Sequence, residues 1–115
     1  MIVQILQIIA AIATILTGLV SLFKPESVTG FTGLHPEGGR GITEIRAVLG
    51  GFFVALGAAP LFLNSPVAYT MLGIAYLGIA LVRGISMFVD KSVTQSNVIS
   101  LVVEIIFGVI LVIPV

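Results

Sequence analysis

Four long apolar stretches, separated by short polar segments, make up most of the chain. They cover residues 2–23, 43–63, 67–89 and 96–114, and each contains 19 to 23 residues. A helix of that length measures roughly 28 to 35 Å, which spans a hydrocarbon core of about 30 Å. Membrane-spanning strands would show strict alternation, which is absent here. The pattern therefore predicts an all-α polytopic membrane protein, a left-handed bundle of four transmembrane helices in one domain covering residues 1–115.

Within these stretches, small and polar residues recur at spacings of three and four, which indicates helix–helix packing seams. Gln7 and Thr14 could instead line a cavity. The first seam contains Gln4, Gln7, Ala11, Thr14, Gly18 and Ser21; the third helix carries Gly73, Tyr76, Ala80, Arg83, Met87 and Asp90; the fourth carries Asn97, Ser100, Glu104 and Phe107.

The second helix has two ridges, after a predicted N-cap at Thr43 and a Glu44 suited to the positive end of the helix dipole. One ridge carries Arg46, Gly50, Phe53 and Gly57, and the other carries Ala47, Gly51, Ala55 and Ala59. The second ridge has a small residue at every fourth position, which permits two helix backbones to approach closely. It could pack inside the bundle or against a second copy of the chain in a dimer or larger homo-oligomer.

Residues 24–41 contain five glycines and two prolines, which predict a long irregular loop. Loops of this length are often functional, as lids or partner contacts. His35 and Glu37 lie close together, but two candidate ligands are too few to indicate a metal site, and none is expected.

Composition agrees with a lipid-facing surface. Hydrophobic residues make up 58% of the chain and charged residues 9%, compared with roughly 25% charged residues in a soluble domain. A net charge of +0 gives no electrostatic basis for nucleic-acid binding, and the absence of cysteine excludes disulfides and cysteine-ligated metal centres. Because no basic segment precedes the first apolar stretch, which exceeds the usual length of a signal peptide's apolar region, we expect a retained membrane helix.

Five ionisable residues gather at one end of the predicted bundle. We call this end the loop side, because the first helix finishes there and the long loop follows. Arg46 lies roughly 5 Å deep, Arg83 roughly 10 Å and Glu104 roughly 12 Å, counted along the helices. Since an unpaired charge in hydrocarbon costs roughly 2.5 to 3.5 kcal/mol, we expect Arg83 to pair with Glu104, and Arg46 to join that pair or Glu44. The predicted charge network comprises Glu44, Arg46, Arg83, Asp90 and Glu104, with Tyr76 and Ser100 on the same seams.

Three functions fit such a network. It could be a static pair that fixes helix register, or the floor of a binding site where an arginine holds the anionic or carbonyl group of a small amphipathic ligand such as a lipid or quinone. It could also serve proton- or ion-coupled transport through Glu104, which is less favoured because two nearby arginines would keep Glu104 ionised. We expect the binding site, with an accessory subunit of a larger membrane complex as the main alternative. No catalytic motif is present, so we expect neither an enzyme nor a cofactor.

Orientation follows from the flanking cations. Lys24, Arg40 and Lys91 all lie on the loop side, and the opposite turn has no lysine or arginine. The positive-inside rule therefore predicts that the loop side and the 90–95 turn are cytoplasmic, with both termini outside an inner membrane.

Three segments carry a family resemblance: EIRAVLGG at residues 44–51, GIALVRGISMFVD at residues 78–90, and Glu104 inside the last helix. Together they resemble a family of small bacterial four-helix membrane proteins of unknown function, which is similar to the DoxX-like group. The resemblance implies a fold and a location in the bacterial inner membrane. The DoxX-like similarity also suggests partnership with respiratory or redox machinery, although the spans contain no histidine to ligate haem.

Overall fold

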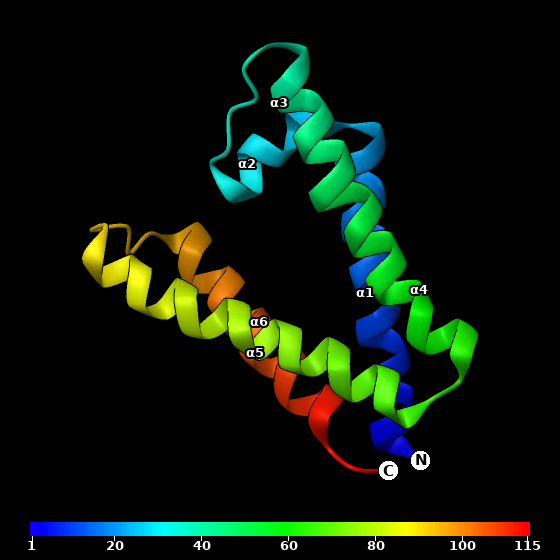
Figure 1. The fold of residues 1–115 in the computed structure, drawn as a ribbon. Helices are drawn as coiled ribbons and strands as arrows, with labels where there is room; N and C mark the ends of the chain where they lie inside the picture. Colours follow the sequence, from blue (N-terminus) through cyan, green and yellow to red (C-terminus); the bar gives the residue numbers. More distant parts are fainter.

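The structure, a computed structural model, describes residues 1–115 and is entirely helical (Figure 1). Segments α3, η2 and α4 follow one another without a break and form one long helix, so that four helices are long and apolar enough to cross a membrane. The predicted all-α, four-span fold is thus confirmed. The elements are α1 (Ile2–Phe23), the 3-10 turn η1 (Pro25–Ser27), α2 (Val28–Thr32), α3 (Gly38–Glu44), the π-helical η2 (Ile45–Phe52), α4 (Phe53–Leu63), α5 (Pro66–Val89) and α6 (Gln95–Val112).

The helices form two antiparallel pairs, α1 with η2 and α4, and α5 with α6. The two pairs meet near the chain termini and diverge toward the loop side, where α2 and the α5–α6 turn lie (Figure 1). Between the pairs, α1 contacts α6 and α4 contacts α5. The loop side is therefore the open end of the molecule.

Glycines allow the helices of each pair to touch backbone to backbone. A Cβ atom added at Gly57 would lie 2.6 Å from the carbonyl oxygen of Ala11, and one at Gly18 would lie 2.8 Å from that of Gly50. In the second pair, a Cβ at Gly73 would lie 2.7 Å from the Cβ of Leu111. Such close approach is how helices associate in lipid, where van der Waals contact replaces the hydrophobic effect.

The seam of α1 is the centre of the fold. Gln7, Ala11, Thr14, Gly18 and Ser21 are buried, as expected for a packing seam, whereas Gln4 is exposed. The main apolar cluster lies where the two helix pairs meet. It comprises Ala10, Ala11, Leu72, Tyr76 and Leu111.

Two polar links join the helix pairs at this junction. The Tyr76 hydroxyl is hydrogen-bonded to that of Thr14, which itself donates to the carbonyl of Ala10 at 2.8 Å. The Gln7 amide donates to the carbonyls of Ile110 and Ile113, at 3.0 and 3.1 Å. These carbonyls lie at the C-terminal end of α6, where the Ile110 carbonyl also accepts from the Ile113 N–H at 3.4 Å. Gln7 therefore adds a cap to α6 from the neighbouring pair.

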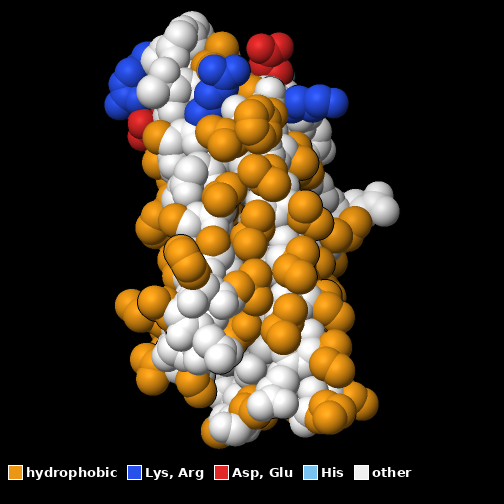
Figure 2. Space-filling model, turned by 90° about the vertical axis from the view of Figure 1, so that its right-hand side faces the viewer, with side chains coloured by type: hydrophobic (Ala, Val, Ile, Leu, Met, Phe, Trp, Pro, Cys, Tyr) orange, Lys and Arg blue, Asp and Glu red, His pale blue; other side chains and the backbone are white.

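Most large apolar side chains lie on the outside. Only 20 of 115 residues are buried, and hydrophobic side chains cover most of the long face shown in Figure 2, with charged groups gathered at its upper end. A surface of this kind is suited to lipid, because hydrocarbon replaces the protein neighbours that a soluble core would supply.

The segment from residue 24 to 41 corrects the sequence prediction. Instead of an irregular loop it contains η1 and α2, and the second long helix begins at Gly38, with Glu37 rather than Thr43 at the N-cap position. Hydrophobic periodicity marks only the part of a helix that lies in hydrocarbon. The helix here continues beyond it into the polar segment, where Arg40 and Glu44 form an ion pair one turn apart.

Candidate functional site

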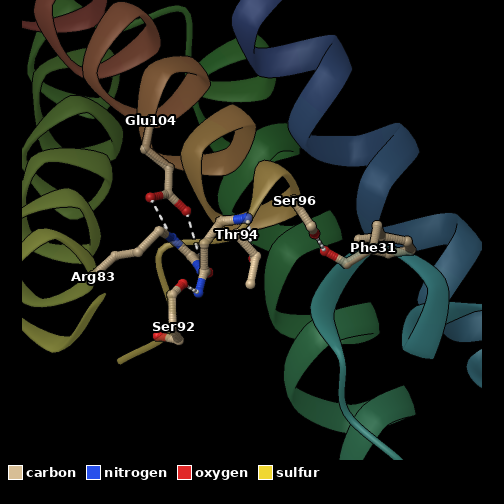
Figure 3. Close-up of polar contacts among 7 residues, drawn as sticks. Phe31, Arg83, Ser92, Thr94, Ser96 and Glu104 are labelled. Carbon is tan, nitrogen blue, oxygen red and sulfur yellow. Dashed lines mark hydrogen bonds and ion pairs between the residues drawn. The ribbon is translucent and has the colours of Figure 1, made fainter. Parts of the chain in front are cut away.

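Arg83 of α5 and Glu104 of α6 form a two-pronged ion pair (Figure 3). The Nε of Arg83 donates to Oε1 of Glu104 at 2.8 Å, and Nη2 donates to Oε2 at 2.8 Å. The side chain of Glu104 is 11% exposed and that of Arg83 is 31% exposed. Parallel hydrogen bonds between a guanidinium and a carboxylate are among the strongest polar contacts in proteins, so this pair fixes the register of α5 against α6.

A third residue holds the guanidinium from the side of the α5–α6 turn. Asn97 Oδ1 accepts a hydrogen bond from Arg83 Nη1 at 2.9 Å, and Asn97 Nδ2 donates to the carbonyl of Ser92 at 2.9 Å. Asn97 lies in the first turn of α6, whose N-cap residue Thr94 accepts from the Asn97 backbone N–H. The geometry of the turn therefore positions the Asn97 amide, and this amide draws the Arg83 guanidinium toward the membrane boundary.

The guanidinium still has hydrogen-bonding capacity. Arginine has five N–H donors, and Glu104 and Asn97 engage three of them, one on each nitrogen. Two N–H groups, one on Nη1 and one on Nη2, remain without a protein acceptor. A carbonyl, phosphate or other oxygen-bearing group could accept from them without disturbing the ion pair.

Arg83 also lines an open pocket of about 560 Å³. One wall of this pocket is apolar and the end nearest the turn is polar. Its lining consists of Gly78, Ile79, Val82, Arg83, Ser86, Met87, Asp90, Ser92 and Asn97. The combination of an apolar wall with a few converging polar groups is typical of sites for small amphipathic molecules.

The other predicted charges do not join this pair. Glu44 is bonded to Arg40 at 2.8 Å on an exposed helix surface. Arg46 is exposed and forms no ion pair, so the prediction that it joins Glu104 or Glu44 is wrong. The reason lies in η2, where π-helical turns change the phase of the side chains relative to a regular helix. Of the same ridge, Gly50 and Gly57 face α1, but Arg46 does not.

The remaining predicted site residues take different positions. Asp90 ends α5, is exposed, and lines the pocket without an ion-pair or hydrogen-bond partner for its carboxylate. Tyr76 is buried against Thr14 and stacks edge-on with Phe107, with ring centroids 5.5 Å apart, so it belongs to the junction of the helix pairs. Ser100 is half-buried and makes no side-chain hydrogen bond.

Asn97 is the site residue that sequence reasoning did not assign to the network. Its signal was present, because it lies on the α6 seam seven residues before Glu104. Two helical turns separate positions seven apart, which places them on one face. The Asn97 side-chain amide on that face therefore indicated a second hydrogen-bond partner for Arg83.

Two further features lie outside this site. Of the second ridge of the long helix, Ala47, Gly51 and Ala55 are exposed and Ala59 is half-buried, so the ridge is not used in packing against α1. Near the termini, Gln7 also lines a pocket of about 290 Å³. The seam and cavity interpretations of Gln7 therefore both apply to it.

On the loop side, one hydrogen bond links α2 to α6. The Ser96 hydroxyl donates to the carbonyl of Phe31 at 3.1 Å (Figure 3). The long loop thus contacts the helix that carries Asn97 and Glu104.

Fold and site together define a small multi-span membrane protein with one buried intramembrane ion pair. The chain belongs to the family described as domain of unknown function DUF4345, whose family model matches residues 2–114. Comparisons with curated proteins and with solved structures find no match.

Proposed function

We propose that this protein binds a small amphipathic membrane molecule, a lipid or a quinone, in the pocket beside Arg83, without catalysing a reaction. The observation that supports this proposal is the pair of unused N–H groups on a guanidinium that is 31% exposed in the pocket wall. An arginine placed inside a membrane span is costly, and residues of this kind are functional candidates by default.

A purely structural role explains less of the geometry. A pair that served only to fix helix register requires that the two side chains meet, but it does not require a pocket beside the guanidinium. Here Glu104 is enclosed, while Arg83 faces an opening. We infer that the carboxylate orients the guanidinium and leaves its two remaining donors to a ligand in the pocket.

The pocket lining matches a ligand with a polar head and an apolar body. Ile79 and Val82 provide the apolar wall, and Val82 is 63% exposed toward the outer surface of α5. The polar groups lie at the other end, by the turn. A ligand would place its oxygen-bearing head against Arg83 and its hydrocarbon against α5.

Native mass spectrometry after extraction in a mild detergent tests the proposal. We expect the wild-type protein to retain a small molecule, and Arg83→Gln to lower its retention about tenfold, the equivalent of about 1.4 kcal/mol. Arg83→Lys keeps the charge but loses the two-pronged geometry, so it should also lose ligand while remaining folded. Arg46→Gln is the matched control, because this arginine forms no ion pair and lies outside the pocket. Equal retention by all four proteins would refute the proposal.

An accessory subunit of a larger membrane complex is the second candidate. It is favoured by the exposure of Ala47, Gly51 and Ala55, since small residues in this pattern allow another helix to approach closely. For this function we also propose the relationship to the DoxX-like group that the sequence resemblance implies, which points toward a respiratory or redox partner in a bacterial inner membrane. The same mass spectrum discriminates, because this function predicts a heterologous polypeptide instead of a small molecule.

Transport is the third candidate and has less support. A titrating carrier needs a carboxylate that exchanges protons, but both oxygens of Glu104 accept hydrogen bonds from Arg83. For any of these functions we propose that the loop side is cytoplasmic, as its three cations suggest.

A further inference from the structure

We propose that the ligand of the Arg83 pocket carries a zwitterionic head, with a phosphate held by Arg83 and an ammonium group held by Asp90, as in an ethanolamine phospholipid. This inference rests on the proposed function and specifies its ligand. It starts from Asp90, whose carboxylate lines the same pocket and has no ion-pair or hydrogen-bond partner in the protein.

The charges of the pocket point to a zwitterion. Arg83 is already neutralised by Glu104, so Asp90 leaves the pocket with a net negative charge. Lys91, the next residue, neither lines the pocket nor pairs with Asp90. A purely anionic head would be repelled by this carboxylate, and a purely cationic one would leave the Arg83 donors unused. A head with an acceptor group and a cation satisfies both.

The depths of Arg83 and Asp90 in the membrane match the order of the phosphate and the amine in such a headgroup. Asp90 follows Arg83 by seven residues, roughly 10 Å along the helix axis. The Arg83 side chain shortens this separation, because Asn97 in the first turn of α6 holds the guanidinium toward the turn. Arg83 is thus the deeper contact and Asp90 the one nearer water. In an ethanolamine phospholipid, the phosphate is likewise attached nearer the glycerol and the amine lies beyond it.

Two sources could supply this chemistry, a membrane phospholipid or a soluble phosphoethanolamine compound. The pocket favours the phospholipid. Its wall at Ile79 and Val82 continues onto the lipid-facing surface of α5, which gives the acyl chains a place to lie. A soluble headgroup would leave this apolar wall uncovered.

The experiment measures lipid retention by native mass spectrometry. The purified protein in detergent is incubated with phosphatidylethanolamine or with phosphatidylglycerol of the same acyl chains. We expect the wild-type protein to retain the ethanolamine lipid about tenfold better. Asp90→Asn should remove this preference, chiefly by admitting phosphatidylglycerol, and should still bind lipid through Arg83. Glu26→Gln is the matched control, because Glu26 is an exposed loop-side carboxylate outside the pocket.

The outcomes separate this inference from the proposed function. Equal retention of the two lipids by the wild-type protein, or a preference that survives in Asp90→Asn, overturns the zwitterion and leaves the binding site standing. Retention of neither lipid also overturns the zwitterion, and lipid retention that Arg83→Gln leaves unchanged overturns the binding site itself. Soluble glycerophosphoethanolamine is added as a competitor. We expect it to displace little lipid at equal concentration, and equal competition would overturn the phospholipid as the source.

Discussion

Removal of either partner of the Arg83–Glu104 pair should destabilise the protein through the same interaction. Each of the two hydrogen bonds is 2.8 Å long and charged at both ends. A hydrogen bond to a charged group contributes about 1.5 to 3 kcal/mol when buried. Because the Arg83 side chain is 31% exposed, solvent screens part of the electrostatic attraction. We therefore expect a coupling free energy of about 2 kcal/mol for the pair.

A double-mutant cycle measures this coupling. Arg83→Gln, Glu104→Gln and the double variant are unfolded with sodium dodecyl sulfate in mixed micelles, with helical circular dichroism as the signal. Each single variant leaves one charge of the pair without its partner, and the double variant removes both charges. The two single losses should therefore exceed the loss in the double variant by the coupling energy.

The second ion pair of the protein provides a matched control. Arg40 and Glu44 are also an arginine and a glutamate, 2.8 Å apart, but their side chains are 80% and 58% exposed. The same cycle on this pair should show no measurable coupling, because exposed charges are screened by water. If the Arg83–Glu104 cycle is additive to within about 0.5 kcal/mol, the reasoning from burial and geometry is refuted.

Three further predictions concern packing, capping and topology. Gly57→Ala should lower the free energy of unfolding by about 1 to 3 kcal/mol, because the new Cβ would lie 2.6 Å from a carbonyl oxygen of α1. Gly78→Ala is the control and should be neutral or stabilising, because its Cβ would have nothing within 4 Å. Equal effects of the two substitutions in the same unfolding assay would contradict the close approach. Gln7→Leu should cost about 1 to 2 kcal/mol and speed amide exchange at the end of α6, since two hydrogen bonds are lost; unchanged exchange would contradict the cap. In this cysteine-free chain, Ser65→Cys should react with an impermeant maleimide in intact cells and Glu37→Cys only after permeabilisation, and the reverse would invert the proposed orientation.

The ion pair was predictable because charges are rare inside the spans. Arg83 and Glu104 lie at similar depths on consecutive helices, and few other partners exist for either in hydrocarbon. Depth counting along a regular helix is accurate over a few turns. The four spans were predictable for a similar reason, since a bilayer requires a minimum length of uninterrupted apolar helix.

The positions of Glu44 and Arg46 required information that the pattern lacks. Low helix propensity argued against helix across Gly38 to Gly41, yet the long helix begins there and brings Arg40 one turn before Glu44. The π-helical segment then alters the side-chain phase, and Arg46 faces outward. Neither effect leaves a clear signal in hydrophobic periodicity.

The role of Asn97 depends on the rotation of α6 about its axis. That rotation is set by contacts between the paired helices, such as Gly108, whose added Cβ would lie 2.5 Å from Leu77. Sequence spacing places Asn97, Ser100 and Glu104 on one seam, but packing decides which side chain reaches Arg83. The structure selects Asn97 and leaves Ser100 unbonded.

The most direct test of the ligand site is a cryo-electron microscopy structure of the protein in lipid nanodiscs that contain phosphatidylethanolamine. We predict density for a headgroup within hydrogen-bonding distance of Nη1 and Nη2 of Arg83, with the amine directed toward Asp90 and the Arg83–Glu104 pair intact. A pocket closed by protein side chains, with a protein oxygen bound to the remaining N–H groups of Arg83, would contradict the account.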